Sequence, residues 1–310
     1  MAETDGRADK ARADKPKADT ARTDTAHKVA AGPVELDEVR NGSGSPLVYL
    51  HGEDGLLFSG PVRDALGASF TVRAPEHPGW GRSDRPWYVN TVDDLSYVYL
   101  DYLDATLDEP APLIGTSFGA WLAAEVAVKS TAKISSLVLV APVGIKVADR
   151  ETRDFVDVYA STTEQVAAAT YGDGARPDLR ALAADEFFYL AEAQEAMARY
   201  GFRPYLHDPA LVHRLHRIDV PTLVLWGADD RFVREPDTYA AAWATAIGSN
   251  AEVASLPGGH RLEEQSPAAV ADAVTAFVAG TAGSGVAGGG TAGSGAAGGA
   301  ADMSVTAAAR

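Results

Sequence analysis

Short apolar runs alternate with longer amphipathic stretches along most of the chain, between residues 33 and 279. The apolar runs predict strands at 47–50, 69–74, 111–114, 134–140, 222–226 and 253–256, with a weaker edge strand at 33–39. The stretches between them predict helices at 58–66, 91–107, 120–128, 236–247 and 267–278. Strands that are apolar on both faces and alternate with helices are typical of a mainly parallel sheet. We therefore predict an α/β fold with helices on both faces of a central sheet.

The alternation is interrupted between residues 146 and 217, where the pattern predicts helices only, at 163–171, 184–200 and 209–217. This segment is rich in Phe and Tyr. We predict that it is a helical cap inserted into a core made of residues 32–145 and 218–279. Ligands of open α/β sheets bind at the carboxyl ends of the strands, so we expect the cap to cover those ends and some of its rings to line a pocket.

Both ends of the sequence have low complexity. Within residues 1–31, short motifs such as Ala-Asp-Lys recur every five residues, a period that gives no apolar face on a helix or a strand. The segment 280–289 (GTAGSGVAGG) recurs almost unchanged at 290–299. We therefore predict a disordered tail over 1–31 and a second, Gly/Ala-rich disordered tail over 280–310.

Composition and charge exclude several classes of function. The 310 residues include no Cys, which removes disulfides, thiolate nucleophiles and thiolate metal sites. No apolar run approaches the roughly 18 residues of a membrane span, and no apolar leader is visible, so we expect a cytoplasmic protein that does not enter a membrane. The net charge of −16 repels phosphate backbones, so we expect no nucleic-acid partner. Nothing in the pattern indicates an oligomeric state.

Candidate chemistry begins at residues 115–119 (GTSFG), between a predicted strand and a predicted helix. Gly-x-Ser-x-Gly in this context is typical of a nucleophilic serine, here Ser117, at the tip of a sharp turn. Glycines are needed on both sides because a Cβ would crowd the strand and the helix. The amides at the start of the helix favour a developing oxyanion. The motif alone also fits an ordinary turn, because Gly and Ser are common turn residues.

Two residues later in the chain are of the kinds that such a serine needs as partners, an acid and a base. Asp230 follows the predicted strand 222–226, and His260 follows the strand 253–256. A serine hydroxyl is a weak nucleophile until a base removes its proton, and the base needs a third group to hold its tautomer. The order Ser, acid, His, with each residue just after a strand, is the order expected for this chemistry on an α/β sheet.

With these features, residues 33–279 resemble the α/β-hydrolase fold superfamily, in its helical-capped branch. The matching residues are His51-Gly52, the loop 78–86, the turn at Ser117, the run 226–230 (WGADD) and Gly259-His260. The resemblance implies Ser117 as nucleophile and His260 as general base. It also implies Asp230 as the acid, because the family's usual spacing from Trp-Gly favours it over Asp229. The implied oxyanion donors are the backbone N–H groups of Glu53 and Phe118, and no cofactor is implied.

Glu53 and Asp54 depart from the family pattern, which often has an uncharged or Pro-containing sequence after His51-Gly52. A carboxylate near a developing oxyanion opposes the reaction unless it points away, which a donor acting through its backbone allows. Among the other histidines, we expect His51 to support the oxyanion loop and the rest to lie on the surface or in the cap: His77, His207, His213 and His216. The last two are three residues apart without a third ligand in view, so no metal site is expected.

The residues and the resemblance together predict a serine hydrolase that cleaves a small to medium carboxylic ester or lactone through an acyl-enzyme. A capped pocket encloses its ligand, which indicates a small-molecule substrate. One alternative is hydrolysis of a carbon–carbon bond, which relatives perform with the same triad. Another is a ligand-sensing protein that keeps the triad without turnover. Ser117 disfavours dehalogenase or epoxide-hydrolase chemistry, in which family members use an Asp nucleophile.

Overall fold

Eight strands form one sheet in the computed structural model, which describes residues 25–284. Across the sheet their order is β1-β2-β4-β3-β5-β6-β7-β8. β1 and β4 pair antiparallel with β2, and the remaining neighbours are parallel, which confirms the predicted mainly parallel sheet. The strands are β1 (Thr25–Ala31), β2 (Val34–Gly42), β3 (Ser45–Leu50), β4 (Phe70–Pro75), β5 (Ala111–Thr116), β6 (Ile134–Val140), β7 (Thr222–Gly227) and β8 (Ala251–Leu256).

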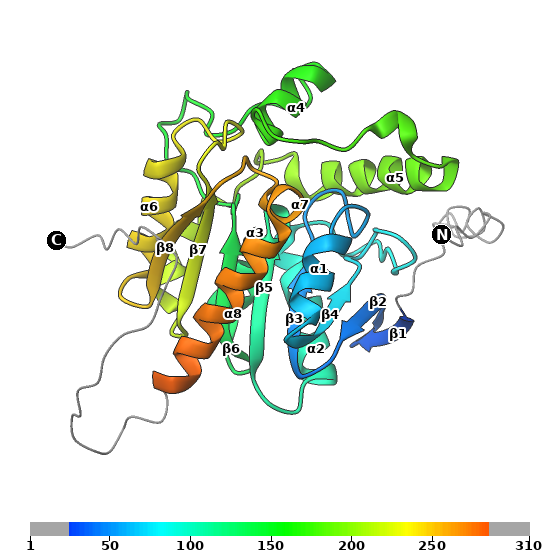
Figure 1. Cartoon of the computed structure of the whole chain (residues 1–310), viewed down its shortest axis with the longest axis vertical. Helices are drawn as coiled ribbons and strands as arrows, with labels where there is room; N and C mark the ends of the chain where they lie inside the picture. Colours follow the sequence, from blue (N-terminus) through cyan, green and yellow to red (C-terminus); the bar gives the residue numbers. More distant parts are fainter. Residues whose placement is uncertain (1–24, 285–310) are drawn as a thin grey trace, which may run out of the picture.

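Helices cover both faces of the sheet (Figure 1). One face carries α1 (Gly60–Gly67), α7 (Leu262–Gln265) and α8 (Pro267–Ser284), and the other carries α2 (Val92–Thr106), α3 (Phe118–Lys129) and α6 (Pro236–Ile247). Each face has its own apolar cluster. The first is formed by residues such as Val62, Leu66 and Val270, and the second by residues such as Leu95, Trp121 and Trp243. None of the helices within residues 25–284 is long and apolar enough to cross a membrane.

In residues 146–217, which we call the cap segment, the long helical part lies over the carboxyl ends of the strands (Figure 1), whereas Arg217 at its end donates to the carbonyl of Val128 in the last turn of α3. The elements of the cap segment are α4 (Thr163–Tyr171), η1 (Leu179–Ala181), α5 (Ala184–Gly201), η2 (Leu211–His213) and η3 (Leu215–Arg217). The first two predicted helices correspond to α4 and α5. The helix predicted at 209–217 is wrong, because the chain forms two short 3₁₀ turns there. Leu211 and Leu215 are both buried, and their spacing of four residues fits these turns as well as a helix.

The strand β1 corrects the predicted N-terminal boundary. Residues 25–31 were assigned to a disordered tail, but they pair with β2 along its length. Val29 and Ala31 are buried and alternate with exposed neighbours, a short strand signal that directly follows the five-residue repeat. As a result β2 is not an edge strand. At the other end α8 continues past residue 279 to Ser284, and the rest of the two predicted tails, 1–24 and 285–310, lies outside the described residues.

The turn between β5 and α3 depends on two glycines. A Cβ built on Gly119 would lie 2.2 Å from the carbonyl oxygen of Leu50, and a Cβ on Gly115 would lie 2.3 Å from the carbonyl oxygen of Gly119. Real Cβ atoms do not approach backbone oxygens so closely. The start of α3 can therefore pack against the end of β3 only because position 119 has no side chain.

We expect Gly119→Ala to lower the free energy of unfolding by about 2 kcal/mol or more, since backbone atoms must shift to admit the methyl group. Gly60→Ala is the matched control. It lies in the first turn of α1, where an added Cβ meets no atom within 4 Å, and its effect should stay within about 1 kcal/mol. Urea unfolding of both variants measures the difference. Equal midpoints would show that the turn relaxes around a methyl group.

Candidate active site

Ser117 lies at the tip of the turn between β5 and α3, at the carboxyl end of a central strand. Its backbone has φ 47°, a left-handed conformation that L-residues rarely adopt. The amide of Ser117 donates to the carbonyl of Val140 at 2.8 Å, which ties the turn to β6. Its hydroxyl lies 2.9 Å from Nε2 of His260. The fold therefore holds a strained serine directly against an imidazole.

His260 lies on the loop after β8, and Asp230 lies on the loop after β7. Nδ1 of His260 is 2.8 Å from Oδ2 of Asp230. The other oxygen of Asp230 accepts the amides of Phe232 and Val233 at 2.8 and 3.2 Å, which fixes the carboxylate. Asp229 is exposed, so the carboxylate that meets the ring belongs to Asp230. The structure thus brings together the three side chains that the sequence analysis selected.

The charge of Asp230 controls the titration of His260. Burial by itself lowers the pKa of the imidazole, but the adjacent carboxylate of Asp230 and the nearby Glu53 outweigh this effect. The pKa of His260 is therefore raised above its ordinary value of 6.5. An imidazole placed this way is a stronger base toward the Ser117 hydroxyl than a buried ring without a partner.

The site is closed to solvent. Ser117 is 3% exposed, Asp230 is 5% exposed and His260 is fully buried. The cap segment contributes to this cover, because the amide of His260 donates to the carbonyl of Thr170 in α4 at 2.8 Å. The ring of Phe232 lies 4.6 Å from the imidazole.

The two predicted oxyanion donors lie on different segments. Phe118 is the first residue of α3, so its amide belongs to the free N-terminal end of that helix. Glu53 lies in a turn closed by the bond from the amide of Gly55 to the carbonyl of Gly52, and its own carbonyl accepts Nε1 of Trp80 at 3.0 Å. Within residues 25–284, neither amide donates to another residue. The amide of Phe118 remains available to an acceptor in the site, whereas the amide of Glu53 also interacts with its own carboxylate.

The side chain of Glu53 lies beside the serine. Burial raises the pKa of this carboxyl, but Arg261, His260, its own amide and the Ser117 hydroxyl together hold the pKa below its ordinary value. Oε1 of Glu53 is 3.0 Å from Nη2 of Arg261. The carboxylate that departs from the family pattern is therefore turned toward the site and stays charged.

Arg261 gathers a group of carboxylates that the sequence analysis did not connect. Besides Glu53, its guanidinium pairs with Asp54 and Glu264 and approaches Glu263. Burial raises the pKa of Asp54 and of Glu263, and it raises the pKa of Glu264 to about 8. The cap segment joins this group, because Gln194 donates to Asp54 and Tyr171 donates to Glu264. The sequence signal for this group was the presence of two acidic pairs, Glu53-Asp54 after His51-Gly52 and Glu263-Glu264 shortly after His260.

The other histidines divide into a buried pair and exposed residues. Nδ1 of His51 donates to the carbonyl of Gly52 at 2.7 Å, and Nε2 of His51 accepts the amide of His77 at 2.9 Å. Burial lowers the pKa of His51 to about 4, so the ring is neutral as it supports the loop of Glu53. The expected surface position of His77 is wrong, since this residue is fully buried. His213 and His216 are exposed, and residues 25–284 hold no cluster of three or more metal-binding side chains.

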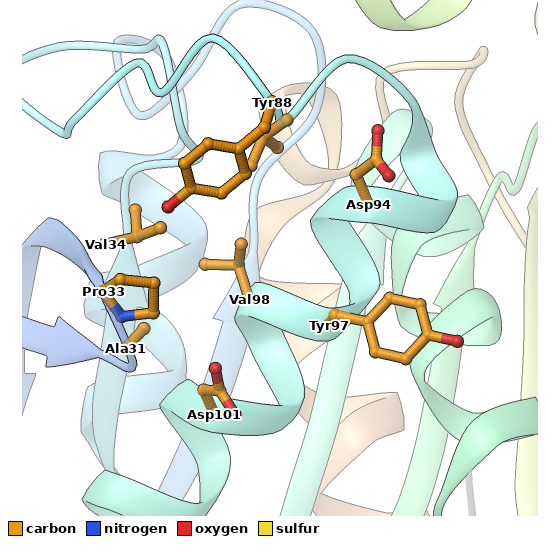
Figure 2. Close-up of a pocket in the computed structure, with 9 residues that line it drawn as sticks. Ala31, Pro33, Val34, Tyr88, Asp94, Tyr97, Val98 and Asp101 are labelled. Carbon is orange, nitrogen blue, oxygen red and sulfur yellow. The ribbon is translucent and has the colours of Figure 1, made fainter.

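A cavity of about 190 Å³ opens elsewhere on the surface (Figure 2). It lies between the β1–β2 hairpin, the loop before α2 and α2 itself, and none of the proposed catalytic residues lines it. Its walls are formed by Ala31, Pro33, Val34, Tyr88, Val89, Asp94, Tyr97, Val98 and Asp101. No ring of the cap segment lines this cavity, so it is separate from the pocket expected beneath the cap.

Comparison with known proteins identifies the family. The model of the alpha/beta hydrolase family matches residues 47–273, which include β3 to β8 and all the site residues above. The chain belongs to this family. The resemblance drawn from the motifs is thereby confirmed, and so is the α/β-hydrolase fold.

Relatives of this α/β hydrolase carry different activities. The dihydrolipoyllysine-residue acetyltransferase component of the acetoin cleaving system of Pseudomonas putida is 28% identical over 260 residues, which are 78% of this chain and 65% of that protein. The chain therefore spans less than two thirds of that relative's length. The 2-hydroxy-6-oxo-6-(2'-aminophenyl)hexa-2,4-dienoic acid hydrolase of Metapseudomonas resinovorans is 25% identical, over 68% of this chain and 77% of its own. A serine hydrolase involved in carbazole degradation has a similar fold, with a TM-score of 0.68 at 23% identity over 83% of this chain and 99% of its own.

Proposed function

We propose that this α/β hydrolase is a serine hydrolase that cleaves a small to medium carboxylic ester or lactone. The observation that carries the proposal is the unbroken line of contacts from the Ser117 hydroxyl to His260 at 2.9 Å and from His260 to Asp230 at 2.8 Å. A nucleophile, a base and an orienting acid in this order are what acyl transfer to water requires. Membership of the hydrolase family supports the same reaction class.

In the proposed reaction, Oγ of Ser117 attacks the ester carbonyl while Nε2 of His260 takes the hydroxyl proton. Asp230 accepts a hydrogen bond from Nδ1–H of the ring, which keeps this proton, and stabilises the imidazolium that forms. The amides of Glu53 and Phe118 would donate to the oxyanion of the tetrahedral intermediate. The imidazolium then gives its proton to the departing alcohol. Water attacks the acyl-enzyme by the same route in reverse, which releases the acid and restores Ser117.

We also propose that residues 146–217 act as a cap over the core made of residues 32–145 and 218–279. The serine is nearly inaccessible in the closed arrangement, so the substrate would enter by movement of this segment or of its side chains. A site that closes around its ligand favours a small molecule over a polymer.

A direct test combines ester turnover with covalent labelling. The full-length protein is incubated with p-nitrophenyl acetate and butyrate, and in parallel with a fluorophosphonate probe whose position is mapped by peptide mass spectrometry. We expect turnover, and a single label on Ser117 that abolishes it. Turnover that survives complete labelling would remove the proposal.

Carbon–carbon bond hydrolysis is the alternative that the dienoic acid hydrolase of M. resinovorans supports. The same serine and histidine would serve both reactions, so the contacts alone favour neither. A 2-hydroxy-6-oxohexa-2,4-dienoate assayed beside simple esters separates them by the ratio of kcat/KM values. A ligand-sensing role would instead show tight binding of one small molecule with turnover far below about 1 s⁻¹.

The proposed role of His260 predicts that kcat/KM falls on the acidic side of its pH profile, which we call the acid limb. Only the neutral imidazole can take the serine proton, so kcat/KM should rise with pH through the pKa of His260 and level off above it. Because Asp230 holds this pKa above 6.5, the midpoint of the limb should lie above pH 6.5. Initial rates with an ester that does not ionise, between about pH 5 and 9, measure it. A flat profile would contradict the base assignment.

A further inference from the structure

One oxygen of Glu53 has no partner beside the proposed nucleophile. Oε1 pairs with Arg261 at 3.0 Å, whereas Oε2 is buried and takes no hydrogen bond from any residue between 25 and 284. The Glu53 side chain is 18% exposed, so it has lost most of its contact with water. A buried carboxylate oxygen without a donor is unfavourable. The presence of an unpaired carboxylate oxygen at this position therefore needs a physical explanation.

The position of the oxygen suggests that reason. Burial raises the pKa of Glu53, but the charges of Arg261 and His260 outweigh this effect and hold the pKa below its ordinary value, so the group stays ionised next to the serine. The carbonyl of a bound substrate must lie within reach of the same hydroxyl. A carboxylate there repels the oxyanion that forms during attack, and a neutral ester offers nothing to offset this repulsion.

Arg261 is not paired with Glu53 alone. Its guanidinium is shared among Glu53, Asp54 and Glu264, with Glu263 close by. Nε of Arg261 is buried and has no hydrogen-bond acceptor among the described residues. Burial raises the pKa of Asp54, Glu263 and Glu264, which favours their neutral forms, whereas the pKa of Glu53 is lowered, so Glu53 is the group that would attract a positive group on the ligand.

We propose that Glu53 selects the substrate by charge, and that it binds an ammonium group close to the scissile carbonyl through Oε2. The proposal rests on the proposed role of Ser117 and names the class of substrate, which is an ester of an amino acid or another ester that carries a nearby primary amine. The ammonium group would donate to Oε2 in a charge-assisted hydrogen bond and offset the carboxylate beside the oxyanion. An anionic ester would be rejected by the same oxygen.

Three methyl esters that share a two-methylene spacer test the proposal: at pH 7 the spacer ends in an ammonium group in methyl β-alaninate, a methyl group in methyl butanoate and a carboxylate in monomethyl succinate. Each is hydrolysed to methanol and its acid, with one water consumed, and the release of acid is followed by titration at constant pH. We expect kcat/KM of the wild type to be roughly tenfold higher for methyl β-alaninate than for methyl butanoate, and lowest for monomethyl succinate. A wild type that prefers the neutral or the anionic ester overturns the proposal without any variant.

Two variants locate the effect. Glu53→Gln keeps the shape and removes the charge, and it should bring the cationic and neutral esters to within about twofold of each other. Asp54→Asn is the matched control, because Asp54 also pairs with Arg261 but bonds to Gln194 of the cap segment rather than lying beside Ser117. We expect Asp54→Asn to keep the preference for the cation. If both variants lost the preference for the cationic ester equally, the preference would come from the combined charge of the carboxyl groups, and the specific role of Glu53 would be overturned.

Covalent labelling separates failure of this proposal from failure of the proposed function. The rate at which a neutral fluorophosphonate labels Ser117 is measured with and without butylammonium or butanol as competitor. We expect butylammonium to protect the wild type more strongly than butanol does, and to lose that advantage in Glu53→Gln. Labelling that both competitors slow equally overturns the charge selection alone. Absence of labelling, together with absence of ester turnover, removes the proposed function and this proposal with it.

Discussion

Ser117→Ala is expected to lower kcat for ester hydrolysis by about 10⁴- to 10⁶-fold. The substitution removes the atom that would bond to the acyl group, and His260 and the oxyanion donors can then only orient a water molecule. The hydroxyl of Ser117 contacts Nε2 of His260 at 2.9 Å, so its loss also leaves the imidazole without its partner in the free protein. The residual rate would come from binding and from the oxyanion amides alone.

Turnover of p-nitrophenyl butyrate measures the loss, with the fold checked by circular dichroism and thermal unfolding. Ser136→Ala is the matched control. Ser136 is also a fully buried serine, on β6, and its hydroxyl has no hydrogen-bond partner in the described part of the chain. Its removal should leave activity within about twofold of the wild type. A loss of less than about tenfold in Ser117→Ala would show that another group carries the reaction.

The sheet and most helices were predictable because their signals are local. Continuous apolar runs marked β3, β5, β6 and β7, and burial on both faces follows directly from such runs. The start of α2 was predictable because Thr91 and Asp94 form a reciprocal capping box, with both bonds at 3.0 Å. In these cases the residues that decide the structure lie within a few positions of one another.

The elements that were missed depend on distant partners. β1 forms because Val29 and Ala31 pack into the core and its backbone pairs with β2, whereas its own sequence is a short stretch directly after the five-residue repeat. His77 looked like a loop residue because Pro and Gly follow it. The neighbours that bury it come from the loop of His51 and from Tyr99 of α2. Neither contact is visible in the pattern of one segment.

The positions of the candidate site residues were predictable, but their side-chain directions were not. Parallel strands end at one edge of the sheet, so residues after β5, β7 and β8 had to come near one another, as Ser117, Asp230 and His260 do. The direction of Glu53 follows from its ion pair with Arg261, which lies at the opposite end of the core sequence. Strand ends place a loop in the fold, but packing decides which way a carboxylate on it points.

Asp230→Asn is expected to lower kcat/KM by about 10⁴-fold while the fold remains intact. The amide oxygen of the new side chain can still accept the amides of Phe232 and Val233, as Oδ1 does now. Its NH₂ group then faces Nδ1 of His260, where Oδ2 of Asp230 lies at 2.8 Å. An NH₂ group donates, so Nδ1 must become the acceptor and the ring proton moves to Nε2. An imidazole with its proton on Nε2 cannot take the proton of Ser117.

Asp229→Asn is the matched control, because it makes the same change one position earlier on an exposed side chain, and its kcat/KM should stay within about twofold of the wild type. The pH profile supplies a second measurement that a purely structural role would not move. The charge of Asp230 raises the pKa of His260, so its removal should shift the acid limb of the remaining activity to lower pH. A large loss in Asp229→Asn with little change in Asp230→Asn would reverse the assignment of the acid. An unshifted limb in Asp230→Asn would mean that the residual activity no longer depends on His260 as its base.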